Sequence, residues 1–300
     1  MAGTHSLLSR RSFLAGVGTA LAGGRRLIDI HQHTNYHLRS NADLVAHQRG
    51  LGVTKTVLLP AGSRYGLAAQ AGGNESVFQL ARQFPNEFVF FANEVSDLPE
   101  ARQVIEQYLK LGARGIGEQK FGVAVDSPHI ELMARLAAEY GVPLLLHFQD
   151  GTYNDGFTRF PGVVRRHPKT VFIGHAQTWW AHIDAAYDGQ SLYPKGRVKA
   201  GGLTDRLLSD YPNVYADLSA GSGLNALLRD EDHARAFLQR HRKKLLYGSD
   251  CADCAPRTGE CTGWRQLEAI GRLAPKEALP DILYNNAARL LRLEDAKQDG

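Results

Sequence analysis

Eight short apolar segments recur along this chain, and each is followed by a stretch with the amphipathic spacing of a helix. The segments are rich in Val, Ile, Leu and Phe, as expected for strands that are buried on both faces. We predict strands at 27–34, 54–59, 87–93, 114–120, 142–148, 170–174, 213–218 and 244–248. The predicted helices are 42–49, 75–83, 99–111, 128–140, 160–166, 203–211, 233–240 and 281–291.

Alternation of strands and helices favours a parallel sheet, and eight repeats favour a closed (β/α)8 TIM barrel of the α/β class. The barrel is expected to form a single domain over residues 25–300, and its 43% hydrophobic residues can fill a core of that size. A doubly wound open sheet is the alternative. No Gly-x-Gly-x-x-Gly pattern follows the first strand, so nothing in the sequence supports dinucleotide binding.

The first 24 residues have the pattern of a twin-arginine export signal. Ser9-Arg10-Arg11-Ser12-Phe13-Leu14 is followed by a Gly/Ala-rich apolar stretch, and Ala20-Leu21-Ala22 is a candidate cleavage site. This stretch is too short to span a bilayer, which needs about 20 apolar residues. We therefore predict a periplasmic protein, exported by the twin-arginine machinery, with no stable membrane association after the signal is removed.

Five of the eight predicted strands end in side chains that can bind a metal. The first strand ends in a His-x-His pair, whose members point to the same side of a strand. The others end in a glutamate, two single histidines and an aspartate. Since the C-terminal ends of barrel strands form the active site, these side chains are expected to meet. They are His31, His33, Glu118, His147, His175 and Asp250.

Lys120 shares a face with Glu118 by the alternation of a strand, and it is a candidate to bind a substrate carboxylate. The longest irregular connection, 178–202, begins with Trp179 and Trp180. Long connections in compact domains are commonly functional. We expect this one to form an ordered flap over the site, with both tryptophans as substrate contacts.

Three cysteines lie close together in the sequence, at Cys251, Cys254 and Cys261. They could form part of a zinc site that lacks a fourth ligand, a disulfide with one thiol left over, or three unpaired thiols. The sequence does not choose among these. The net charge is +4, and the sequence contains no run of five or six like charges. The charge pattern therefore indicates no nucleic-acid partner.

The set of strand-end residues resembles the amidohydrolase superfamily. Gly248-Ser249-Asp250 and the closing Asn286-Ala287-Ala288-Arg289-Leu290-Leu291 resemble its amidohydrolase-related branch, over roughly residues 27–292. The resemblance implies a divalent ion held by His31, His33, His147 and Asp250. His175 would be a catalytic acid/base in a one-metal site, or a ligand of a second metal. Gly117-Glu118 resembles members with a metal-facing glutamate, which leaves Lys120 for substrate.

This resemblance implies a metal-dependent hydrolase that cleaves a lactone, ester or amide of a small organic substrate with a metal-activated water. Asp250 and His175 would move protons. Mixed nitrogen and oxygen ligands favour zinc, with manganese or iron as alternatives, as one or two ions. A nonoxidative decarboxylase with the same ligands and a non-catalytic metal-binding barrel are the competing hypotheses.

Overall fold

The computed structural model describes residues 26–63 and 71–293. The predicted export signal at 1–24 lies outside these residues and remains a prediction. The described part contains eight strands, close to the predicted positions. They are β1 (Ile28–Gln32), β2 (Lys55–Leu58), β3 (Phe88–Phe90), β4 (Ile116–Gln119), β5 (Leu144–His147), β6 (Phe172–His175), β7 (Val214–Asp217) and β8 (Leu245–Leu246).

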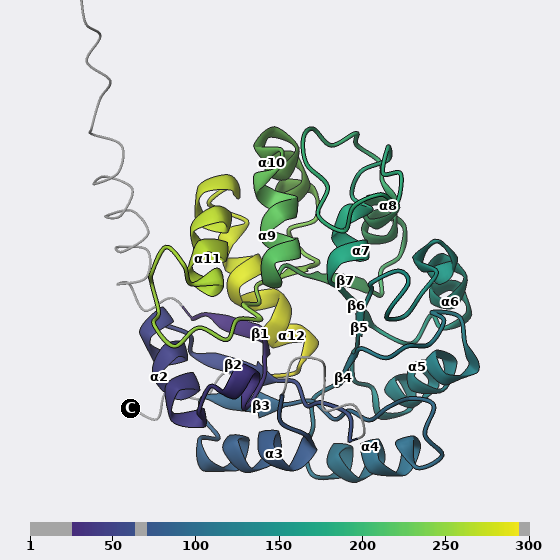
Figure 1. Ribbon diagram of the computed structural model, residues 1–300, viewed down its shortest axis with the longest axis vertical. Coiled ribbons are helices and arrows are strands. Elements are labelled where there is room, and N and C mark those ends of the chain that lie inside the picture. The colour runs from purple at the N-terminus through teal and green to yellow at the C-terminus, as the bar shows by residue number, and fades with distance from the viewer. Residues whose placement is uncertain (1–25, 64–70, 294–300) are drawn as a thin grey trace, which may run out of the picture.

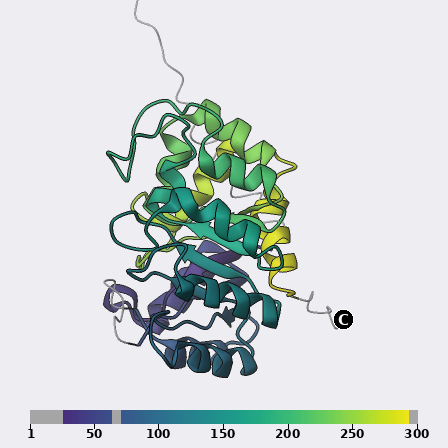
Figure 2. The same ribbon diagram turned by 90° about the vertical axis from the view of Figure 1, so that its right-hand side faces the viewer.

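All strand pairs are parallel, in the order β1-β2-β3 and β4-β5-β6-β7-β8. Backbone hydrogen bonds join the two groups on both sides. Gly117 N donates to Ala92 O at 2.9 Å between β4 and the end of β3, and Ile30 N donates to Tyr247 O at 3.0 Å between β1 and β8. The strands therefore close into a ring, which confirms the predicted parallel α/β fold. Helices surround the strands in Figure 1, and Figure 2 gives the same arrangement turned by 90°.

The predicted helices are all present in the described chain. They are α2 (Asn41–Leu51), α3 (Asn74–Gln83), α4 (Ala101–Lys110), α5 (Pro128–Tyr140), α6 (Phe160–Arg166), α8 (Leu203–Asp210), α10 (Glu231–Arg240) and α12 (Asn286–Leu290), the last preceded by a π-helical turn, Asp281–Asn285. Capping residues begin and end α5, as the sequence predicts. In α5, the Ser127 side chain accepts a hydrogen bond from Ile130 N, Pro128 occupies the first turn, and Gly141 ends the helix at φ 63°.

Three further helices were not predicted: α7 (Gln177–Ala181), α9 (Ala220–Leu228) and α11 (Thr262–Leu273). α7 occupies the start of the connection predicted to be irregular. α9 contains Gly221 and Gly223, which lower helix propensity, so tertiary packing stabilises it. By contrast, α11 buries Trp264, Leu267 and Ile270 at helical spacing, a pattern visible in the sequence.

Apolar side chains pack in two layers, one inside the barrel and one between the strands and the surrounding helices. The interior layer contains Ile28, Val57 and Ile173 from the strands, together with Ala287 of α12 and Leu291 just after it. A larger layer packs the outer faces of the strands against the helices. Since α12 follows the last strand and packs on this interior layer, the polar strand ends gather at the other end of the barrel. No helix in the described ranges 26–63 and 71–293 is long and apolar enough to cross a membrane.

Candidate active site

His31 and His33 meet at the end of β1, as their spacing predicts. Their Nε2 atoms lie 3.2 Å apart, and both side chains are buried. His33 Nδ1 donates to Leu59 O at 2.8 Å, and His31 Nδ1 lies 2.6 Å from Asp217 Oδ2. Because a carbonyl oxygen can only accept, His33 carries its proton on Nδ1. Each ring is thereby oriented with Nε2 directed toward the common site.

Glu118 connects this pair to the histidines of β5 and β6. Its Oε2 atom lies 3.6 Å from His31 Nε2 and 3.5 Å from His33 Nε2. The other oxygen, Oε1, lies 2.5 Å from His147 Nδ1 and 3.7 Å from His175 Nε2. The carboxylate therefore spans two groups of nitrogen ligands, one on each side.

The backbone before Glu118 requires glycine. Gly117 has φ +127°, a region that disfavours other residues, and a Cβ there would lie only 2.6 Å from Leu145 O. Strand register also shifts near both sets of site residues, between Asp29 and Gln32 in β1 and between Ile116 and Gln119 in β4. Such irregularities redirect side chains next to active sites.

Asp250 closes the site from the turn that follows β8. Its Oδ1 atom lies 3.5 Å from His33 Nε2 and 3.7 Å from His31 Nε2, and its Oδ2 lies 3.6 Å from His175 Nε2. The Asp250 backbone has φ 45°, which is uncommon for an aspartate, and its N–H donates to His31 O at 2.9 Å. Gln32 Nε2 also donates to Cys251 O at 3.2 Å, so β1 holds the turn that carries Asp250.

Asp217 and Tyr36 are two site residues that the sequence interpretation missed. Asp217, at the end of β7, lies against His31 Nδ1 and is 3.2 Å from His175 Nδ1. Ser219 Oγ donates to Asp217 Oδ2 at 2.9 Å. The signal for Asp217 was available, because it is the next-to-last residue of the predicted strand 213–218. Tyr36 lies beside His33, with ring centroids 4.9 Å apart, in a short 3-10 turn.

Three carboxylates, those of Glu118, Asp217 and Asp250, lie among the histidines of the site. Burial alone would raise the pKa values of Glu118, Asp217 and Asp250, but neighbouring histidines outweigh it and all three pKa values are lowered. Burial lowers the pKa of His31, yet Asp250, Asp217 and Glu118 outweigh this effect and the net pKa is raised. Carboxylates held away from water need compensating positive charge, which protonated imidazoles or a divalent cation would supply.

The donor atoms fit such a cation. His175 Nε2 and Asp250 Oδ1 are buried and have no hydrogen-bond partner within the described chain. Their separations from neighbouring donors, 3.5–3.7 Å, are too long for good hydrogen bonds. Ligands about 2.1 Å from a tetrahedral ion would lie about 3.4 Å apart. Three overlapping metal-capable groups result: His31–His33–Glu118, His31–His175–Asp250 and Glu118–His147–His175.

Lys120 lies near this site, whereas the tryptophans do not face it. The Lys120 ammonium is 5.6 Å from the centroid of the Tyr153 ring. Burial would lower the Lys120 pKa, but Glu118 and Asp250 outweigh it, so the side chain stays cationic. The prediction for Trp179 and Trp180 needs correction. They are 0% and 3% exposed and belong to the hydrophobic core, so they pack the barrel wall rather than contact substrate.

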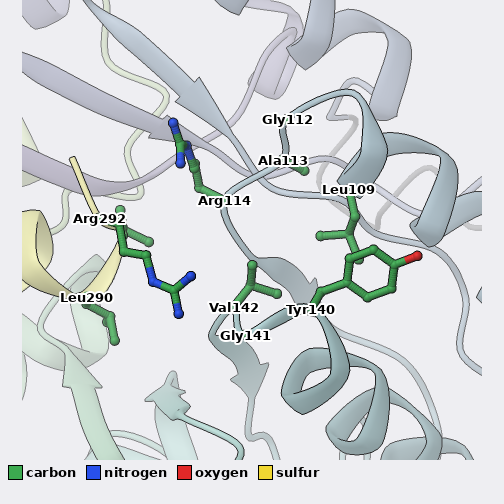
Figure 3. Close-up of a pocket in the computed structure, with 10 residues that line it drawn as sticks. Leu109, Gly112, Ala113, Arg114, Tyr140, Gly141, Val142, Leu290 and Arg292 are labelled. Carbon is green, nitrogen blue, oxygen red and sulfur yellow. The ribbon is translucent and has the colours of Figure 1, made fainter. Parts of the chain in front are cut away.

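A separate hollow lies at the opposite end of the barrel (Figure 3). Its lining includes Arg114 and Val142, which precede β4 and β5, together with Leu290 at the end of α12 and Arg292 just after it. None of the metal-capable side chains described above lines it. In a TIM barrel this end serves stability rather than catalysis. The strand-end cluster, and not this hollow, is therefore the candidate active site.

Asp217→Asn is expected to weaken metal binding about 10- to 100-fold, the usual effect of losing a partner that orients a ligating histidine. The amide can donate as well as accept, so it no longer fixes Nδ1–H on His31. Competition with a chelating dye measures the affinity. Asp205→Asn is the matched control. Asp205 Oδ1 lies 2.5 Å from His241 Nε2, and neither residue belongs to the site. Equal affinities in wild type and Asp217→Asn would contradict this role.

Comparisons with known proteins agree with the fold. A protein-family model with the description amidohydrolase matches residues 28–293. A search of curated proteins finds no match. Among solved structures, an uncharacterized TIM-barrel protein from Bordetella bronchiseptica has TM-score 0.63 at 15% identity, covering 89% of this chain and 98% of its own.

Two other similar structures have named activities. A putative 2-pyrone-4,6-dicarboxylic acid hydrolase from Pseudomonas putida has TM-score 0.60 at 16% identity, covering 90% of this chain and 98% of its own. A 5-carboxyvanillate decarboxylase from Sphingomonas paucimobilis has TM-score 0.57 at 15% identity, covering 90% and 100%. At these identities the likeness shows a shared fold.

Proposed function

Because this chain belongs to the amidohydrolase family, as the match over residues 28–293 shows, we propose that it hydrolyses a lactone, ester or amide of a small organic acid. The observation that carries the proposal is a pair of carboxylates, the buried Glu118 and the largely buried Asp250, that each face two groups of histidine nitrogens. This arrangement would suit two divalent ions at the strand ends, for which zinc is the first choice.

The two ion positions would share Glu118. His31 Nε2, His33 Nε2 and Glu118 Oε2 would hold one ion, and Glu118 Oε1, His147 and His175 the other. Bound ions would polarise a substrate carbonyl and acidify a water molecule. Burial lowers the pKa of His147 to about 4, despite the nearby Glu118 carboxylate. Its ring is therefore neutral at pH 7, which is the form that binds a metal.

Asp250 is the proposed proton carrier. Histidine neighbours outweigh the effect of burial and keep its pKa low, so the carboxylate is ionised at neutral pH and can accept a proton from attacking water. It would return that proton to the leaving group. His175 assists, because Asp217 holds its Nδ1 side. Asp250 raises the pKa of Tyr36, so this phenol stays protonated and can donate to a developing oxyanion.

Lys120→Met is expected to raise KM about 10- to 100-fold for an anionic substrate, since a hydrogen bond to a charged group contributes about 1.5–3 kcal/mol. The reason is loss of the cation that would bind the substrate carboxylate beside Tyr153. Steady-state kinetics measures this change. Lys110→Met, on the exposed face of α4, is the matched control. An unchanged KM for the Lys120 variant would remove Lys120 from substrate binding.

Nonoxidative decarboxylation is the second candidate. A decarboxylase is among the structures that share the fold, and Lys120 could hold the carboxylate of an aromatic acid as well as that of a lactone. Both reactions would use the same protein ligands, so the ligands do not distinguish them. The products do, because hydrolysis adds water to the substrate whereas decarboxylation releases carbon dioxide.

The test is a panel of lactones, esters, amides and aromatic carboxylic acids, assayed with metal-loaded protein in ¹⁸O-labelled water. One ¹⁸O atom in the organic product, with no carbon dioxide, supports hydrolysis. Carbon dioxide with no label in the organic product favours the decarboxylase. Turnover of no panel compound by protein that demonstrably holds its metal would count against the enzymatic proposal and favour a non-catalytic metal-binding barrel.

A further inference from the structure

A second group of metal-capable side chains lies outside the strand-end site. It consists of His47 from α2, Cys251 just after Asp250, and Cys261 at the start of α11, and we call it the cysteine cluster. All three side chains are buried, at 0%, 3% and 0% exposed. His47 is more than 200 residues away from both cysteines in the sequence, so the fold brings it to them.

The separations within the cysteine cluster match those of ligands that share one ion. His47 Nε2 lies 3.3 Å from Cys261 Sγ and 3.8 Å from Cys251 Sγ. A tetrahedral zinc ion, with Zn–S about 2.3 Å and Zn–N about 2.05 Å, places nitrogen and sulfur about 3.6 Å apart. The two observed distances bracket that value, and the three ligand atoms all lie within 4.8 Å of one another.

The surroundings of Cys261 favour an anionic sulfur. Cys261 is the N-cap of α11, a helix of 12 residues, and its Sγ accepts a hydrogen bond from Trp264 N at 3.4 Å. The N-terminus of a helix stabilises negative charge, and thiolates are the form of cysteine that binds metals. The sulfur also faces His47 Nε2, and a thiolate and an imidazole nitrogen are both donors that suit zinc.

Close packing holds the two parts of the cluster in place. One turn after His47, Gly50 approaches the loop between Cys251 and Cys261 so closely that a Cβ would lie 2.4 Å from Pro256 Cγ. On the other side, Gln32 Nε2 contacts Cys251 O at 3.2 Å. The cluster therefore joins α2 to the segment that carries Asp250, and an ion there would fix that segment.

We propose that His47, Cys251 and Cys261 bind a structural zinc ion, separate from the ions of the active site, with a water molecule in the fourth position. The ion cross-links α2 to the segment after β8 and so holds Asp250 in place. Cys254 takes no part, because its side chain is exposed and outside the cluster. It provides a matched control of the same residue type, three positions from Cys251.

Cobalt substitution tests this site in the full chain. Thiolate-to-cobalt charge transfer absorbs in the near ultraviolet, and the active-site ligands, which contain no sulfur, cannot produce that band. We expect the band in the wild type and in Cys254→Ser, and its loss in Cys261→Ser and His47→Gln. A wild type without the band overturns the proposal. So does a band that survives Cys261→Ser, or one that Cys254→Ser abolishes.

A second measurement needs no variant and so does not depend on how a variant folds. In native zinc-loaded protein, one of the three cysteines, Cys254, is expected to react with a thiol reagent, and all three after chelation and unfolding. Intact mass under non-reducing conditions is the check on redox state. A mass lower by two hydrogen atoms would show a disulfide in place of the zinc ligands and overturn the proposal.

Discussion

Asp250→Asn is expected to lower kcat by ~10³-fold or more, while the barrel stays folded. Moving a proton with a positioned side chain contributes about 10²–10⁴-fold to an enzymatic rate, and an amide cannot do it. Asparagine keeps the size of aspartate and its hydrogen bond to His31 O, which involves the backbone N–H alone. Its side-chain oxygen can still face His31 and His33, so ion binding should suffer less than turnover.

Steady-state kinetics of the metal-loaded variant, beside its metal content and unfolding curve, checks this expectation. Asp126→Asn is the control, because Asp126 forms a partly exposed ion pair with Arg159 at 2.9 Å and belongs to none of the metal-capable groups of the described residues. Exposed pairs of this kind contribute about 0–1 kcal/mol to stability. Full activity in Asp250→Asn would remove Asp250 from proton transfer. Equal loss of metal and activity would make it only a ligand.

The fold could be predicted because its signals are local. Alternating apolar strands and capped helices recur often enough that the barrel follows from periodicity, and barrel geometry then brings the strand ends together. His31, His33 and Glu118 meet for this reason. The same rule, applied to the seventh strand, would have identified Asp217, whose role as a partner of His31 and His175 depends on contacts between strands far apart in the chain.

The sequence could not predict which side chains pack together outside the repeated strands and helices of the barrel. Trp179 and Trp180 occur in a long connection and suggested a flap, but α7 turns both into the core, where Trp180 Nε1 donates to Asp217 O at 3.0 Å. The cysteines lacked a further ligand in their own segment. His47 supplies it from α2, and no spacing rule connects a helix residue to a loop some 200 positions away.

Metal content should show that Glu118 bridges two ions. We expect Glu118→Ala to bind about two fewer ions per chain than wild type, because the carboxylate belongs to both ligand groups. His33→Ala and His147→Ala should each lose about one, since each histidine belongs to a single group. Elemental analysis after dialysis gives these differences, and the cysteine cluster contributes equally to every sample.

His129→Ala, on α5 and outside every metal-capable group of the described residues, should bind as many ions as wild type. The number of ions that each variant loses distinguishes a two-ion site from a one-ion site. If Glu118→Ala and His33→Ala each lose one ion and His147→Ala loses none, a single ion is held near His31 and His33. His147 and His175 would then act on substrate, and the bridged two-ion arrangement proposed for the hydrolysis would be wrong.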